Sequence, residues 1–198
     1  MIHSNSAIPL RSWIIHTTYG WFMGVILIIV LSGLFEFSGI TDMQFYLGVG
    51  MGTGIGLFQW FALHKQYRTS IQYVIYSILG LGIPYIILDF FSTLSQEWNI
   101  ILGFTVGGIF SSLLQTRCLP SAFLNAQKWV VYSTVSWLIS LGMLQISNYT
   151  YALKEHIPNT IILACWNLFL ILAGGPILGY ATGKLLPQYP TQKPPSSV

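Results

Sequence analysis

Charged residues are scarce in this chain of 198 residues: Asp, Glu, Lys and Arg together make up 7% of it, whereas apolar residues make up 54%. A soluble domain carries about 25% charged residues, which keep its surface hydrated. The mean hydropathy of +0.66 therefore excludes a soluble enzyme, a nucleic-acid-binding domain and a disordered linker. It indicates a protein of the lipid bilayer.

Residues that perform chemistry are also few. The two cysteines, Cys118 and Cys165, fall near opposite ends of two different apolar runs, so they form neither a disulfide framework nor a metal-binding pair. The sequence shows no metal-ligand spacing, phosphate-binding glycine loop or Gly-x-Ser-x-Gly motif. We therefore expect no catalytic residue, no metal site and no cofactor, and the chain is predicted not to be an enzyme.

Six apolar runs approach the length of about 20 residues that a bilayer-spanning helix needs. They cover residues 12–33, 44–63, 71–90, 98–117, 128–147 and 159–186. The first run is longer than the core of a signal peptide, so we expect it to remain as the first span. The sequence thus predicts an all-α polytopic membrane protein with one six-helix transmembrane domain over residues 1–186. A Pro-rich disordered cytoplasmic tail is predicted for residues 187–198.

The charges divide between the two ends of these runs. Seven of the eight basic residues fall on one side: Arg11, Lys65, Arg68, Arg117, Lys128, Lys184 and Lys193. The five acids fall on the other side, with Lys154: Glu36, Asp42, Asp89, Glu97 and Glu155. Because basic residues in short loops stay in the cytoplasm, we expect both termini to be cytoplasmic. The membrane is predicted to be a bacterial inner membrane, with a thylakoid membrane as the alternative.

The chain also matches itself. A shift of 56 residues aligns the second and third spans with the fourth and fifth, a shift of 116 aligns the first with the fifth, and a shift of 67 aligns the fourth with the sixth. The matched pairs include Gly52 and Gly108, Gln59 and Gln115, Leu63 and Leu119, Trp13 and Trp129, Trp21 and Trp137, and Leu119 and Leu186. The repeated unit is a helical hairpin, at about 13–65, 73–119 and 129–186. Three hairpins in the same orientation predict a pseudo-threefold arrangement about the membrane normal.

The first hairpin contains the segment Gly56-Leu57-Phe58-Gln59-Trp60-Phe61-Ala62-Leu63. It resembles an uncharacterised family of six-span bacterial membrane proteins, frequent in cyanobacteria. In that family a Gly-rich helix leads into Gln-Trp-x-x-Leu, and a helix that starts with Trp follows. The second hairpin departs from this pattern with Leu114-Gln115-Thr116-Arg117-Cys118-Leu119, and the third has Thr182 in place of the glutamine. The resemblance implies the fold and adds no activity.

Glycines follow one face of the second span. Gly48, Gly52 and Gly56 recur at a spacing of four, which stacks them along a helix. Equivalent small residues occur in the fourth and sixth spans: Gly108, Ser112, Gly175, Gly179 and Gly183. Close backbone approach over small residues supplies much of the helix association in lipid. We expect the even spans to pack through these faces toward the centre, with a homodimer face or a lipid or pigment groove as alternatives.

Four polar side chains form a candidate cluster. Gln59 and Gln115 lie about one turn inside the cytoplasmic boundary, where an amide bonds across helices or lines a polar vestibule. His16 aligns with tyrosines in the other two hairpins, which indicates an aromatic ring with one hydrogen-bonding tip rather than a metal ligand. Asn167 is the main polar side chain deep in the sixth span.

Taken together, the residues favour a membrane protein that acts by packing against other membrane components. The leading hypothesis is an accessory or assembly subunit whose partners are the lipid bilayer and other integral membrane proteins or a second copy, and no nucleic acid. The alternative is a small transporter or pore for a neutral or apolar solute. No ionisable group falls near the predicted midplane, which argues against a proton-coupled pump.

Overall fold

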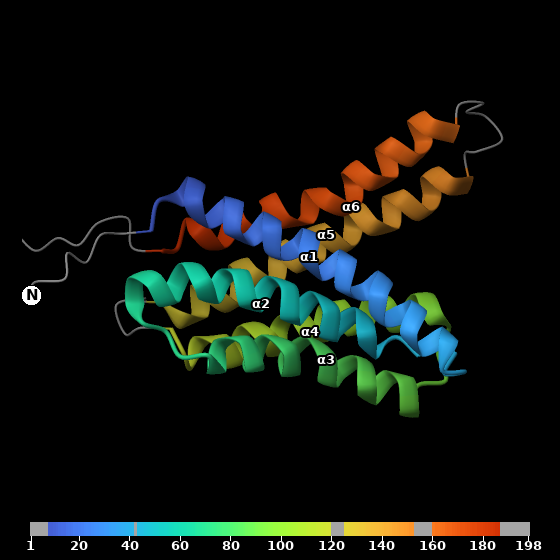
Figure 1. The fold of residues 1–198 in the computed structure, drawn as a ribbon, viewed down its shortest axis with the longest axis horizontal. Helices are drawn as coiled ribbons and strands as arrows, with labels where there is room; N and C mark the ends of the chain where they lie inside the picture. The colour runs from blue at the N-terminus through green and yellow to red at the C-terminus, as the bar shows by residue number, and fades with distance from the viewer. Residues whose placement is uncertain (1–7, 42, 120–124, 153–159, 187–198) are drawn as a thin grey trace, which may run out of the picture.

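The structure, a computed structural model, describes residues 8–41, 43–119, 125–152 and 160–186 (Figure 1). Within these ranges it contains six α-helices and no strand. The helices are α1 (Leu10–Phe37), α2 (Phe45–Tyr67), α3 (Gln72–Phe91), α4 (Gln96–Thr116), α5 (Ala126–Ala152) and α6 (Thr160–Gly183). Each helix falls on one of the six predicted apolar runs. The predicted tail at 187–198 lies outside the described residues.

Five of the six helices, all except α2, are long and apolar enough to cross a membrane, judged by length and composition. The prediction of an all-α, membrane-embedded chain with several spans is confirmed. Helix α2 differs because glycine occupies five alternate positions from Gly48 to Gly56. Glycine contributes little hydropathy, so α2 is less apolar than its neighbours although it has 23 residues.

The helices form a closed ring. Each packs against the next in the chain, and α6 packs against α1. Successive helices run in opposite directions, so their connections alternate between two ends of the bundle (Figure 1). Ile8, which precedes α1, and Leu186, which follows α6, belong to one hydrophobic cluster. We call the end that holds this cluster the terminal end. Toward the opposite end, α5 and α6 run together away from the ends of α1 to α4 (Figure 1).

The sequence predicted that the glycine faces meet at the centre of the ring, and the structure shows that they do not. A Cβ atom on Gly52 would lie 2.6 Å from the carbonyl oxygen of Ser77 on α3. The glycines of the predicted faces pack instead against the next odd helix: Gly48, Gly52 and Gly56 against α3, Gly108 against α5, and Gly175, Gly179 and Gly183 against α1. The physical reason is distance. Neighbours in the ring touch backbone to backbone, whereas the wider space on the axis needs longer side chains.

Asp89, in the last turn of α3, closes the N-terminus of α2. Its carboxylate accepts hydrogen bonds from the backbone N–H of Gln44, at 2.9 and 3.0 Å, and of Phe45, at 2.8 Å. The first N–H groups of a helix have no partner within the helix, and a negative charge there is favoured by the helix dipole. This carboxylate therefore joins α2 to α3 at the end opposite the termini.

Candidate functional site on the bundle axis

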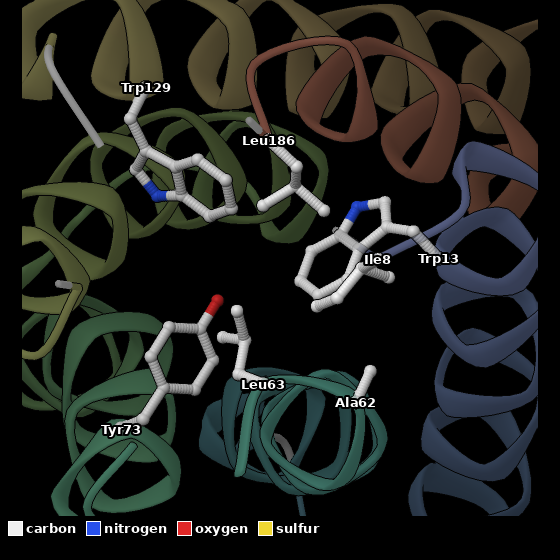
Figure 2. Close-up of a cluster of buried hydrophobic side chains, with 7 residues drawn as sticks. All are labelled: Ile8, Trp13, Ala62, Leu63, Tyr73, Trp129 and Leu186. Carbon is white, nitrogen blue, oxygen red and sulfur yellow. The ribbon is translucent and has the colours of Figure 1, made fainter. Parts of the chain in front are cut away.

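Large side chains close the bundle axis at the terminal end. Figure 2 shows them pointing toward a common centre from four helices and from both flanking segments. The cluster consists of Ile8, Trp13, Ala62, Leu63, Tyr73, Trp129 and Leu186. The rings of Trp13 and Trp129 meet edge to face, with centroids 6.2 Å apart. We call this cluster the terminal layer.

A layer of hydrogen-bonded polar side chains lies directly beside the terminal layer. Gln59 of α2 is its first member. The hydroxyl of Tyr73 donates to Gln59 Oε1 at 2.8 Å, and Gln59 Nε2 donates to Thr17 Oγ1 at 3.3 Å. All three side chains are buried. One amide therefore connects α2 to both of its neighbours, α1 and α3.

Gln115 of α4 makes the same kind of bridge. The indole N–H of Trp129 donates to Gln115 Oε1 at 3.3 Å, and Gln115 Nε2 donates to Ser77 Oγ at 2.9 Å. The Ser77 hydroxyl in turn donates a hydrogen bond to the carbonyl oxygen of Tyr73, at 2.8 Å. This second amide thus connects α4 to α3 and α5.

Thr182 of α6 occupies the third place in the polar layer. Unlike the glutamines, it connects its helix to only one neighbour, α1. Its Oγ1 accepts from the indole N–H of Trp13 at 2.9 Å and donates to the carbonyl oxygen of Leu178 at 2.6 Å. On the other side, Ser133 of α5 is 2% exposed. Its hydroxyl has no hydrogen-bond partner among the described residues. The short side chain of threonine leaves that hydroxyl unbridged, whereas the glutamines reach both neighbours.

A small cavity of about 10 Å³ lies among these groups. That volume is about what one water molecule requires. Its polar lining comes from Gln59, Ser77, Ser111, Gln115, Ser133 and Thr182. These are amides and hydroxyls, which offer hydrogen-bond donors and acceptors without a charge. Such groups can form hydrogen bonds to a neutral molecule as small as water.

A second apolar layer closes the other side of the cavity. The rings of Trp21 and Trp137 lie with centroids 5.4 Å apart, and both side chains are buried. The indole N–H of Trp21 donates to the carbonyl oxygen of Ile171 at 2.8 Å. Pro176 lacks an N–H and leaves one carbonyl of this turn of α6 without its helical donor. The bond from Trp21 supplies a donor to the adjacent carbonyl, so it anchors α6 to α1 where the α6 ladder is interrupted.

The structure brings together only two of the four residues in the predicted polar cluster. Gln59 and Gln115 both line the cavity. His16 instead pairs with the carbonyl oxygen of Ser12 in its own helix, with Nδ1 2.8 Å away. Asn167 accepts a hydrogen bond from Thr150 between α5 and α6, toward the opposite end. The single four-residue cluster was wrong because its members face different interfaces.

Three hydroxyls that the sequence reasoning did not select belong to the polar layer. They are Thr17, Ser77 and Ser133, and each lies four residues after the aromatic residue that begins its helix's buried face. Residues four apart share a helix face. The alignment of the three hairpins held this signal, since Ser77 falls on Ser133 at the shift of 56.

In the described part of the chain, no group of three or more His, Cys, Asp or Glu side chains lies close enough to hold a metal ion. Comparison with protein-family models, with curated proteins and with solved structures finds no match for this chain.

Proposed function

We propose that the chain is a six-span membrane protein built from three repeated hairpins. Three parallel contacts support the repeat. The aromatic residues Trp13, Tyr73 and Trp129, near the starts of α1, α3 and α5, donate to Thr182, Gln59 and Gln115 on the even helices that precede them in the ring. Helix α2 counts as a span because it runs between α1 and α3 and packs against both. The resemblance to six-span bacterial membrane proteins agrees with this architecture.

We also propose that both termini lie in the cytoplasm of a bacterium, with the chain in the inner membrane or a thylakoid membrane. The described basic residues lie at the terminal end: Arg11, Lys65, Arg68, Arg117, Lys128 and Lys184. The described acids lie at the opposite end: Glu36, Asp89 and Glu97. Basic residues in short loops are retained on the cytoplasmic side.

The function that the geometry supports best is that of an accessory or assembly partner for other membrane components. The observation behind it is the packed axis. Two apolar layers enclose a cavity of about 10 Å³, so the space between these layers, as far as the described residues define it, holds about one water molecule. A molecule filled in this way acts through its outer surface.

The first half of α6 is a thinly covered part of that surface. Between Ile161 and Phe169 only Leu163 is buried. Trp166 and Phe169 stack there with ring centroids 5.8 Å apart, and they are 49% and 60% exposed. Aromatic residues on an open face are typical anchors of a protein interface. We therefore place the partner on this half of α6.

The test uses the full chain in native membranes, with chemical cross-linking followed by extraction in mild detergent. We expect a complex larger than the monomer, which the double variant Trp166→Ala/Phe169→Ala loses. The matched control, Phe22→Ala/Phe90→Ala, removes two exposed aromatics from α1 and α3 and should keep the complex. A lone monomer in mild detergent, with no cross-linked partner, would contradict the accessory role.

A second candidate function, carriage of a small neutral solute, is favoured by one observation. The unbridged Ser133 hydroxyl lies beside two glutamine amides at the axial cavity. Opening of the apolar layers would expose these groups to a neutral hydrogen-bonding solute. Thermal unfolding in the presence of neutral solutes tests this role: a stabilising solute should lose its effect in Ser133→Ala. A flat response across such solutes argues against transport.

A further inference from the structure

The outer surface has a groove between α5 and α6 at the terminal half of the bundle. Its volume is about 600 Å³, within the usual range for sites that hold a small organic ligand. Val135 of α5 and Pro176 and Ile177 of α6 contribute its apolar lining. Tyr132 and Tyr180 line the part nearer the terminal end. The groove is therefore apolar along its length, and two phenol rings mark one end.

Two lysines lie beyond these tyrosines. Lys128 precedes Tyr132 by four residues on α5, and Lys184 follows Tyr180 by four residues at the end of α6. Residues four apart share a helix face, so both lysines lie on the groove side of their helices. Lys184 Nζ lies 4.3 Å from the centroid of the Tyr180 ring, and both lysines are exposed. The groove thus has two positive charges at its terminal end.

We propose that this groove binds one anionic phospholipid. Its acyl chain lies along the apolar lining, and its phosphate lies between Lys128 and Lys184. Both α5 and α6 are apolar enough to cross a membrane, so the groove opens to lipid. Its order, from charge through phenol to aliphatic side chains, matches that of a phospholipid from headgroup to acyl chain.

The dimensions favour a lipid over a protein helix. An α-helix with side chains is about 10–12 Å in diameter and spans about 30 Å in 20 residues. Such a cylinder needs over ~2,000 Å³, several times the groove volume of about 600 Å³. A narrow acyl chain fills the groove, whereas a helix would only cover its rim. The inference requires α5 and α6 to lie in the bilayer, and it does not depend on the accessory role.

The test is native mass spectrometry of the full chain released from nanodiscs that contain equal amounts of phosphatidylglycerol and phosphatidylcholine. The wild type should retain one phosphatidylglycerol in preference to phosphatidylcholine. The attraction between a lysine and anionic headgroups corresponds to about fivefold in affinity per residue. Lys128→Gln/Lys184→Gln should therefore reduce the preference roughly 25-fold, whereas Lys128→Arg/Lys184→Arg should keep it. Lys65→Gln, at the same end on α2, removes a lysine charge away from the groove and should leave the preference unchanged.

The acyl-chain half is tested by filling the groove. Val135→Trp should abolish lipid retention, and Val106→Trp, at an equally exposed valine on α4 (both 48%), should not. Circular dichroism confirms that the variants remain helical. Equal retention of both lipids, a Lys65→Gln effect as large as that of the double glutamine variant, or full retention in Val135→Trp overturns the proposal. So does cross-linking in membranes from position 135 to a second copy or to another protein instead of lipid.

Discussion

Thr182→Gln should complete the polar layer and stabilise the protein. In the first two hairpins, a glutamine accepts a hydrogen bond from one neighbouring helix and donates one to the other. A glutamine at position 182 would accept from the Trp13 indole in place of the threonine hydroxyl. Its Nε2 would donate to the Ser133 hydroxyl, which has no partner among the described residues.

The gain follows from the groups involved. An interhelical hydrogen bond in a membrane protein contributes about 0.6 kcal/mol on average, and a buried polar group without a partner costs about 1–3 kcal/mol. Ordering the longer side chain opposes part of this gain. The two additional heavy atoms need about the room of one water molecule, which is what the axial cavity holds. We expect about 1 kcal/mol of added stability, or ~3 °C in unfolding temperature.

The assay is reversible unfolding of the purified chain in detergent, arranged as a double-mutant cycle. Ser133→Ala alone should be neutral to slightly stabilising, because it removes a buried hydroxyl that has no protein partner in the described residues. In the Thr182→Gln background it should remove the gain. Thr182→Val keeps the shape of the side chain but leaves the Trp13 indole N–H without its acceptor, which should lower the free energy of unfolding by about 1–3 kcal/mol. Destabilisation by Thr182→Gln, together with an equal effect of Ser133→Ala in both backgrounds, would refute the reasoning.

Three further predictions concern packing, capping and topology. Gly80→Ala should cost about 1–3 kcal/mol in unfolding free energy, because its Cβ would lie 2.6 Å from the Ser111 nitrogen, whereas Gly33→Ala, with nothing within 4 Å, should cost nothing. Asp89→Asn should lose about 1 kcal/mol, measured in the same unfolding assay, because a neutral amide replaces the carboxylate that caps α2. Burial raises the pKa of the Cys118 thiol, so a membrane-impermeant maleimide should label it slowly at neutral pH and faster at alkaline pH. In a variant whose exposed Cys165 is replaced by Ser, Cys118 should be labelled in inside-out vesicles and not in intact cells, and the reverse result would contradict cytoplasmic termini.

The helices could be predicted from sequence because each depends on a local property. An apolar run of about 20 residues indicates a membrane helix wherever it lies. Each of the six apolar runs coincides with one helix of the structure. The ends were less certain: α1 extends to Phe37 and α5 to Ala152, beyond the predicted ends at 33 and 147. Helices project past the hydrocarbon region when their connections allow it, and a hydropathy boundary does not record this.

The contents of the site depend on rotation about each helix axis, which sequence spacing leaves open. Gln59 and Gln115 were selected because amides are rare in apolar helices, and both line the cavity. His16 and Asn167 are polar residues that are just as rare in apolar helices, yet neither lines the cavity. His16 bonds within α1, and Asn167 bonds to Thr150 between α5 and α6. The glycine faces show the same limit. Their four-residue spacing defines one side of a helix, but the identity of the neighbour on that side follows only from the ring.

Three separate features fall on the α5–α6 hairpin. It holds the unbridged Ser133 hydroxyl, the groove between its own two helices and the thinly covered start of α6. Thr182 is common to these features because it accepts a hydrogen bond from Trp13 of α1 and makes none to α5 among the described residues. A bundle of three equivalent hairpins needs no such exception to be stable. If the proposed function is right, the hairpin α5–α6 is where the protein meets its partner, and a glutamine at position 182 would add stability there at a cost in function.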